Sequence, residues 1–310
     1  MHKVVDTRTI SHEEWLQYRK QGLTGTDAGA ITGMNPFSSA FKVYQDKITD
    51  EIETFDNESM RQGRDLEDYV AQRFMEAMNL KVRRTNAIYA HDEYPFLMGN
   101  FDRIVVGEKA GLECKTVGAY SADKWKDGNI PLHYQLQCQH YLAVSGFKSW
   151  YIAALVLGRE LIIHKLERDE ELIQNLISIE KKFWEENVLA RVIPEPDGSD
   201  NYTQMIGKLY GIGKLDKEVL LPELKDELER RAELVELEEK IKTEKEQIDQ
   251  RVKMQMQDAT YAKSAQFQIS WKNSETKRLD GKRLKEENPE LYEGYCKTTN
   301  SRRFLVKKVA

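Results

Sequence analysis

Three charged residues, Asp102, Glu113 and Lys115, have the types and spacing needed for hydrolysis of a phosphodiester bond. Glu113 and Lys115 belong to the segment GLECKT, within a predicted strand over 110–118. Alternate residues of a strand point to the same face, so these two side chains are expected side by side. Asp102 belongs to the preceding predicted strand, 96–107, and the short GEKAG segment predicts a hairpin between the two strands. Two carboxylates and a lysine are therefore expected at one end of a hairpin.

This set of side chains suits metal-dependent phosphate chemistry. Asp102, Glu113 and the backbone carbonyl of Cys114 form a hard oxygen donor set for Mg²⁺, with Mn²⁺ as a substitute. Such a cation neutralises the scissile phosphate and lowers the pKa of a bound water. Lys115 is placed to orient that water and to stabilise the developing negative charge. A charged hairpin without catalytic function is the alternative, because the pattern [DE]-x-K recurs in this chain, for example at Glu180.

Candidate supporting residues lie upstream of the hairpin. Glu67, on a helix predicted over 57–80, is a candidate third acid beside the metal, or belongs to a solvated helix face. Arg19 and Thr26 flank a Gly-rich turn that enters a helix, and helix N-termini of this kind bind anions. An ordinary N-cap is the alternative for Thr26.

Two glutamines lie downstream, on a helix predicted over 132–146. Gln135 and Gln139 are about one turn apart and share a helix face. Their amides are candidates for hydrogen bonds to DNA or to a metal-bound water, and ordinary surface positions explain them equally.

Alternating helix and strand patterns predict an α/β domain over 1–200, which holds the candidate nuclease hairpin. Helices are expected at 10–22, 38–48, 57–80, 132–146 and 168–192, and strands at 81–91, 96–107, 110–118, 150–158 and 160–167. The turn-rich segment 194–201 ends this domain. An extension over 201–310 is expected to hold a charged helix at 222–257 and a small basic α/β tail, with strands around AQFQISWK and RRFLVKK flanking a helix around ENPELYEGY.

The apolar residues of the charged helix fall into two staggered seven-residue series, which argues against a long two-stranded coiled coil. Packing against the chain's own body or a neighbouring subunit fits better, and a solvated helix with one apolar stripe is the simplest interpretation.

Composition predicts a cytoplasmic protein. The N-terminus is polar, and no apolar run approaches the roughly 20 residues needed to cross a bilayer. The three cysteines form no CxxC or zinc spacing, so they are expected as reduced thiols. The formal net charge is −5, yet residues 263–310 hold 12 Lys/Arg against 6 Asp/Glu. An acidic body with a basic tail binds nucleic acid only where its basic residues converge.

The order of these motifs resembles the YqaJ-like viral recombinase family, which is related to phage lambda exonuclease within the PD-(D/E)xK nuclease superfamily. The resemblance rests on Arg and Thr around TGTDAG, Glu in a GRxLE helix, Asp, E-x-K and then QxQxYLxV, and it covers about residues 10–190. It implies a restriction-endonuclease-like α/β core with a mixed central sheet flanked by helices. Phe101 stands where the superfamily signature has proline, a position without a chemical role.

Carried over to this sequence, the resemblance implies that Asp102 and Glu113 are the metal-binding acids and that Lys115 is the catalytic lysine. It implies that Glu67 is the helix acid near the metal and that Gln139 is the active-site glutamine.

By the same resemblance, Arg19 and Thr26 hold the 5′-phosphate end of the DNA. The family implies a Mg²⁺-dependent 5′→3′ exonuclease that digests one strand of linear duplex DNA and leaves 3′ overhangs. A single-strand annealing protein then uses these overhangs in phage recombination, inside the bacterial host. Relatives are ring-shaped homo-oligomers. A non-catalytic DNA-binding recombination scaffold, a structure-specific endonuclease on the same fold and a structural phage protein are the alternatives.

Overall fold

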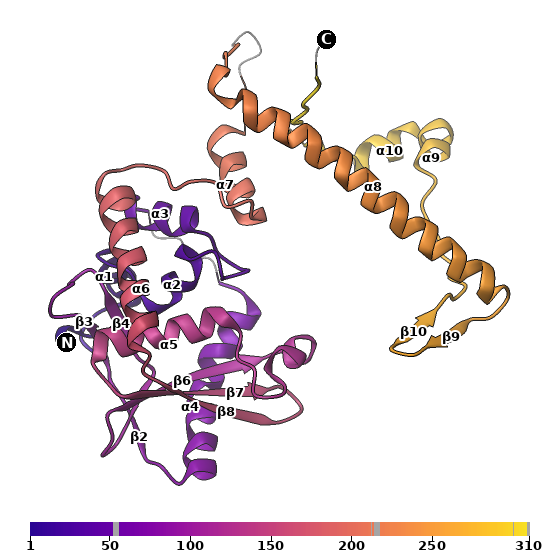
Figure 1. Cartoon of the computed structure of the whole chain (residues 1–310). Coiled ribbons are helices and arrows are strands. Elements are labelled where there is room, and N and C mark those ends of the chain that lie inside the picture. The colour runs from indigo at the N-terminus through magenta and orange to yellow at the C-terminus, as the bar shows by residue number, and fades with distance from the viewer. Residues whose placement is uncertain (52–55, 212, 214–217, 300, 309–310) are drawn as a thin grey trace. The chain divides into compact units, whose positions relative to one another are not determined.

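The chain folds as two compact units, Met1–Tyr210 and Gly211–Ala310 (Figure 1). This computed structural model describes residues 1–51, 56–211, 213, 218–299 and 301–308. The charged hairpin identified in the sequence lies in the first unit.

A five-stranded sheet forms the centre of the first unit. Its strand order is β2-β5-β6-β7-β8, and its strands span Val82–Arg84, Arg103–Val105, Ala110–Val117, Ser149–Val156 and Leu161–Glu167. Neighbouring strands are antiparallel except β6 and β7, which are parallel. A parallel pair needs a crossover connection, and helix α5 (Leu132–Ser145) lies in that connection. The sheet is therefore mixed, as expected from the sequence.

Helices cover both faces of this sheet (Figure 1). The side chains of β7 alternate between the two faces, so successive residues pack against different helices. Trp150, Ile152 and Ala154 pack in one apolar cluster with residues of α5. Tyr151 and Ala153 pack on the other face with α4, which spans Glu58–Met78. Both faces of the strand are buried, which explains its nearly continuous apolar sequence.

A second, three-stranded sheet has the order β1-β3-β4, with strands His2–Asp6, Ala87–Ala90 and Met98–Asn100. The strands expected over 81–91 and 96–107 are thus each divided between two sheets. Asn86 adopts a positive φ of 47° between β2 and β3, which interrupts the first. Phe101 and Asp102 separate β4 from β5 and interrupt the second. Asp102 therefore lies where the chain passes from one sheet to the other.

The remaining helices of the first unit are α1 (His12–Lys20), α2 (Gly25–Ile31), α3 (Ala40–Ile48), α6 (Glu170–Lys182) and α7 (Asp200–Tyr210), and α6 continues into a π-helical turn over Phe183–Leu189. Among them, α1, α3 and α6 were predicted, α2 follows the Gly-rich turn, and α7 was not predicted. Ser11 and Glu14 form the expected capping box at the start of α1. The boundary after Tyr210 is later than the expected residue 200, because Tyr202 of α7 is buried with its ring centroid 4.7 Å from that of Phe41.

The second unit is built around one long helix, α8 (Lys225–Met256), as expected. A hairpin of β9 (Tyr261–Ser264) and β10 (Phe267–Ser270) follows, and then α9 (Gly281–Glu287) and α10 (Pro289–Tyr295). The strand expected around RRFLVKK does not form over the described residues 301–308.

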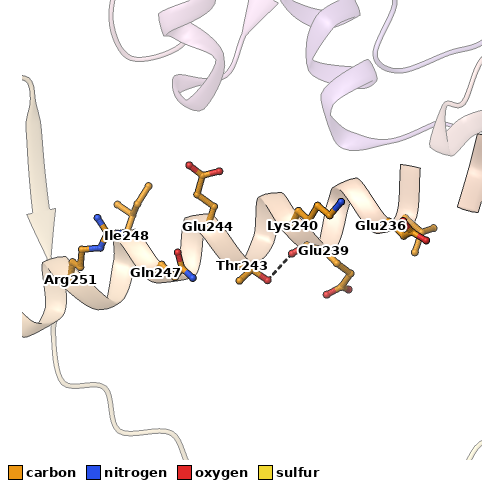
Figure 2. Close-up of a pocket in the computed structure, with 9 residues that line it drawn as sticks. Glu236, Glu239, Lys240, Thr243, Glu244, Gln247, Ile248 and Arg251 are labelled. Atoms are coloured by element: carbon orange, nitrogen blue, oxygen red, sulfur yellow. Dashed lines mark hydrogen bonds between the residues drawn. The ribbon is translucent and has the colours of Figure 1, made fainter. Parts of the chain in front are cut away.

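A shallow hollow runs along α8, and Figure 2 shows the side chains around it. Every residue that lines this hollow belongs to α8 itself, from Val235 to Arg251. Because one helix supplies the entire lining, the hollow is an open helix surface and we assign no ligand to it.

Candidate active site

Strand register brings Asp102, Glu113 and Lys115 together, as the sequence predicts. Arg103 pairs with Leu112 across the β5–β6 hairpin, so Asp102 lies opposite Glu113. The Oδ2 atom of Asp102 accepts a hydrogen bond from the backbone N–H of Cys114 at 2.8 Å. The Nζ atom of Lys115 lies 2.6 Å from the Oε1 atom of Glu113. The predicted hairpin thus forms, and its charged residues converge.

The two carboxylate oxygens of Glu113 have different surroundings. Its side chain is buried, and Oε1 accepts hydrogen bonds from Lys115 Nζ and from Gln137 Nε2, both at 2.6 Å. Gln137 Nε2 also lies 3.0 Å from the Tyr141 hydroxyl. The Oε2 atom is buried too, but no other described residue donates a hydrogen bond to it. A buried carboxylate oxygen without a partner is costly, so this atom is suited to bind a ligand.

The carboxylates of Asp102, Glu113 and Glu67 concentrate negative charge at this site. Burial raises the pKa of Asp102 well above its ordinary value, and the nearby Glu113 and Glu67 raise it further. Burial alone would lower the pKa of Lys115, but the carboxylates of Glu113 and Asp102 outweigh burial and raise that pKa. Lys115 is therefore an ammonium group at neutral pH. Its Nζ atom lies 4.9 Å from the centroid of the Tyr134 ring.

Arg103 holds Glu67 beside Asp102. Its buried guanidinium donates to the carboxylates of Glu67 and Asp68 on α4, and to the backbone carbonyl of Asp102 at 2.7 Å. Sequence reasoning missed Arg103. Its signal was its position directly after Asp102, because the next residue of a strand points to the opposite face, here toward α4.

The glutamine beside the carboxylates is Gln137, whereas Gln139, the glutamine expected in the active site, lies apart from them. Gln139 donates to the backbone carbonyl of Glu167 at 2.9 Å and accepts from the backbone N–H of Asp169 at 3.2 Å. Gln135 donates to the backbone carbonyl of Ile130 at 2.6 Å. Residues two apart on a helix point about 200° apart, so Gln137 and Gln139 face opposite sides of α5. The signal for Gln137 was Tyr141, one turn later on the same face.

Arg19 and Thr26 are in contact. The Nη2 atom of Arg19 lies 3.1 Å from Thr24 Oγ1 and 3.2 Å from Thr26 Oγ1. The guanidinium carbon lies 4.7 Å from the centroid of the Trp15 ring. Thr24, with Asp27 as its partner, forms the capping box of α2. The Thr26 hydroxyl is therefore not the N-cap, which removes the simplest structural explanation for it.

Tyr141 connects this threonine-rich turn to the carboxylates. A Cβ atom added to Gly25 would lie 2.5 Å from the Tyr141 ring, so α2 approaches α5 closely there. The Tyr141 hydroxyl lies beside Gln137, which donates to Glu113. The Arg19–Thr26 pair and the charged hairpin thus lie on either side of one aromatic residue.

The donor set fits a hard divalent cation. Burial, together with the charge of Asp102, raises the pKa of Cys114, so its side chain stays a thiol and its backbone carbonyl is the available donor. The Oε2 atom of Glu113 is a free oxygen donor, and the raised pKa of Asp102 indicates that negative charge is in excess at this site. Within the described ranges, no group of three or more His, Cys, Asp or Glu side chains is arranged to hold a metal. Backbone carbonyl and solvent ligands would complete the coordination.

The central hairpin of a mixed, helix-flanked sheet thus carries two acids and a lysine in this chain. Residues 14–148 match the sequence model of the YqaJ-like viral recombinase domain. The uncharacterized protein YqaJ of Bacillus subtilis (strain 168) is 35% identical over 306 residues, which cover 97% of this chain and 96% of that protein. The chain therefore belongs to the YqaJ-like viral recombinase family.

A solved structure shares this fold. LHK-Exo in complex with dAMP superposes with a TM-score of 0.50 and 18% identity, covering 64% of this chain and 99% of that one. A second structure of LHK-Exo, an alkaline exonuclease from Laribacter hongkongensis, has a TM-score of 0.49, 18% identity and the same coverage. No helix in the described part of the chain is long and apolar enough to cross a membrane.

Proposed function

We propose that this protein is a Mg²⁺-dependent 5′→3′ exonuclease that degrades one strand of linear duplex DNA. One observation carries the proposal: Glu113 keeps a free, buried oxygen opposite Asp102, while Lys115 and Gln137 occupy its other oxygen. Membership of a viral recombinase family supports a nuclease role in recombination. The likeness to LHK-Exo, an alkaline exonuclease solved with the nucleotide dAMP, supports a nucleic-acid substrate.

Asp102, Glu113 and the Cys114 carbonyl would hold the cation, which supplies charge neutralisation at the phosphate and activates water. Mn²⁺ would bind the same oxygen donors. Lys115 remains protonated and donates to the charge that develops on the phosphate oxygens. Gln137 fixes the rotamer of Glu113 by its hydrogen bond to Oε1. Glu67, held by Arg103, adds a third acid at the edge of the site.

Arg19 and Thr26 would bind the 5′-phosphate end of the substrate strand. Guanidinium and hydroxyl groups both donate hydrogen bonds to phosphate. Arg19 already lies between Thr24 and Thr26, so the donors are preorganised at one point of the threonine-rich turn. Anchoring of a terminal phosphate on one side of Tyr141, with hydrolysis on the other, would give the enzyme its 5′→3′ direction.

The proposed product is a 3′ single-stranded overhang, handed to a single-strand annealing protein during phage homologous recombination in the host cytoplasm. A ring-shaped homo-oligomer would enclose the duplex. Such a ring would contact several phosphates at once, so its activity would fall steeply as salt concentration rises.

Digestion of linear duplex DNA, with and without a 5′-phosphate, tests the proposal. We expect Mg²⁺-dependent loss of one strand from phosphorylated ends, no digestion in EDTA, and no digestion by Lys115→Ala. Lys109→Ala is the matched control, because Lys109 is exposed in the turn of the same hairpin. Cutting of closed circles would instead identify an endonuclease. Absence of cutting with either Mg²⁺ or Mn²⁺ would leave a DNA-binding scaffold on a nuclease fold.

A further inference from the structure

The β9–β10 hairpin of the second unit exposes aromatic residues on both of its faces. Tyr261 pairs with Ser270, and the two strands join through a two-residue turn at 265–266. Tyr261 is 66% exposed, Phe267 70% and Trp271, directly after β10, 48%. None of the apolar clusters among the described residues includes a residue of this hairpin. These rings therefore do not contribute to a core within the described chain.

Cations accompany the exposed rings. Lys263 shares a face with Tyr261, because residues two apart on a strand point the same way. The Nζ atom of Lys272 lies 4.9 Å from the centroid of the Tyr261 ring. Neither lysine forms a salt bridge with another described residue. Residues 258–285 hold 7 Lys/Arg against 3 Asp/Glu, so an excess of positive charge surrounds the hairpin.

Exposed rings on a hairpin whose lysines form no salt bridge with other described residues have the chemistry of a single-strand binding surface. Unpaired bases stack on aromatic side chains, and lysines neutralise the adjacent phosphates. Duplex DNA offers the phosphates but keeps its bases stacked internally, so it cannot use the rings. We propose that the β9–β10 hairpin binds single-stranded DNA. Tyr261 would be a stacking platform beside the phosphate contacts Lys263 and Lys272, and Phe267 and Trp271 would be stacking platforms on the opposite face.

This inference deepens the proposed function and rests on it for its biological meaning. An exonuclease that removes one strand of a duplex continuously produces the other strand as single-stranded DNA. A hairpin on the same chain that binds this strand would keep the product from re-pairing or leaving. Its sequence tolerance would suit a product of any sequence, because every base has a face that can stack.

Fluorescence anisotropy with labelled oligo-dT tests the binding without catalysis. The full chain carrying Lys115→Ala is used in EDTA, with an oligonucleotide of about 20 nucleotides, longer than the 4–16 that one stacking domain covers. We expect Trp271→Ala to weaken binding about 5- to 150-fold, which corresponds to ~1–3 kcal/mol for one stacked base. Lys272→Gln should lower the slope of log affinity against log salt by about 0.7.

The substitution at Trp271 distinguishes stacking from apolar docking. Trp271→Phe should retain most of the affinity because it keeps a ring face, whereas Trp271→Leu should lose it. Leu237→Ala, at an exposed apolar position of α8, is the control and should bind like the parent. Equal affinity of parent and Trp271→Ala for oligo-dT, or full retention in Trp271→Leu, would overturn the proposal. Because no hydrolysis is measured, a negative binding result says nothing about exonuclease activity. A negative exonuclease assay likewise says nothing about binding by the hairpin.

Discussion

Replacing each of two neighbouring glutamines with alanine separates the chemistry of this site from its architecture. Gln137 and Gln139 are both buried on α5, yet the first contacts the Glu113 carboxylate and the second contacts only backbone groups. The family resemblance assigned the catalytic role to Gln139, and the structure favours Gln137. The two substitutions remove the same atoms from the same helix, so each is the other's control.

Gln137→Ala removes a hydrogen bond to an ionised carboxylate, and such bonds contribute about 1.5–3 kcal/mol. If the bond holds Glu113 in the orientation that the reaction needs, its loss lowers kcat by about 10- to 160-fold. Lys115 would remain bound to the same oxygen at 2.6 Å, so residual activity is expected.

Gln139→Ala removes two hydrogen bonds that join α5 to the corner between β8 and α6. Each neutral bond contributes about 1 kcal/mol to stability, so the free energy of unfolding should fall by about 2 kcal/mol. The rate should stay within about twofold of the parent, because a loss of ~0.4 kcal/mol or less at the reacting groups corresponds to that factor.

Single-turnover digestion of 5′-phosphorylated duplex DNA measures the first effect, and urea unfolding measures the second. The expected pattern is a slow but folded Gln137→Ala variant and an active but less stable Gln139→Ala variant. An inactive Gln139→Ala variant with an unchanged urea midpoint would refute the placement of Gln137 as the active-site glutamine.

Two further predictions concern charge. Burial and neighbouring acids raise the pKa of Asp102, so the folded chain holds a proton that the unfolded chain releases, and metal-free stability falls as pH rises through that pKa. Asp102→Asn should therefore raise the metal-free melting temperature at neutral pH, yet abolish the rise on adding Mg²⁺, measured by calorimetry. Burial opposes the charge of His140, but Glu180 outweighs burial and raises the His140 pKa, so this pair stabilises most at low pH. Urea unfolding from about pH 6 to pH 9 should show stability lost with rising pH in the parent and less in His140→Gln.

The hairpin was predictable from the sequence because it depends only on residues that are close together in the chain. Glu113 and Lys115 share a face through the two-residue period of a strand, and the GEKAG segment set the distance to Asp102. The division of two predicted strands between separate sheets was not predictable in this way. It depends on a positive φ at Asn86 and on the break at Phe101 and Asp102. Partners distant in sequence contact both places: the Asn86 carbonyl accepts from the backbone N–H of Thr7, and the Phe101 ring packs against Trp150.

Arg103 and Gln137 show why the rest of the site escaped sequence reasoning. A periodic pattern states which residues share a face, but it does not state what that face meets. Arg103 points toward α4 only because Leu112, its partner in the register, lies on the α4 side of the sheet. The parallel pairing of β6 and β7 requires a crossover, and α5 lies in that crossover. One face of α5 lies against the hairpin, and Gln137 on that face contacts Glu113. The rotation of α5 about its own axis selects between the two glutamines, and contacts distant in sequence, such as His140 with Glu180 on α6, fix that rotation.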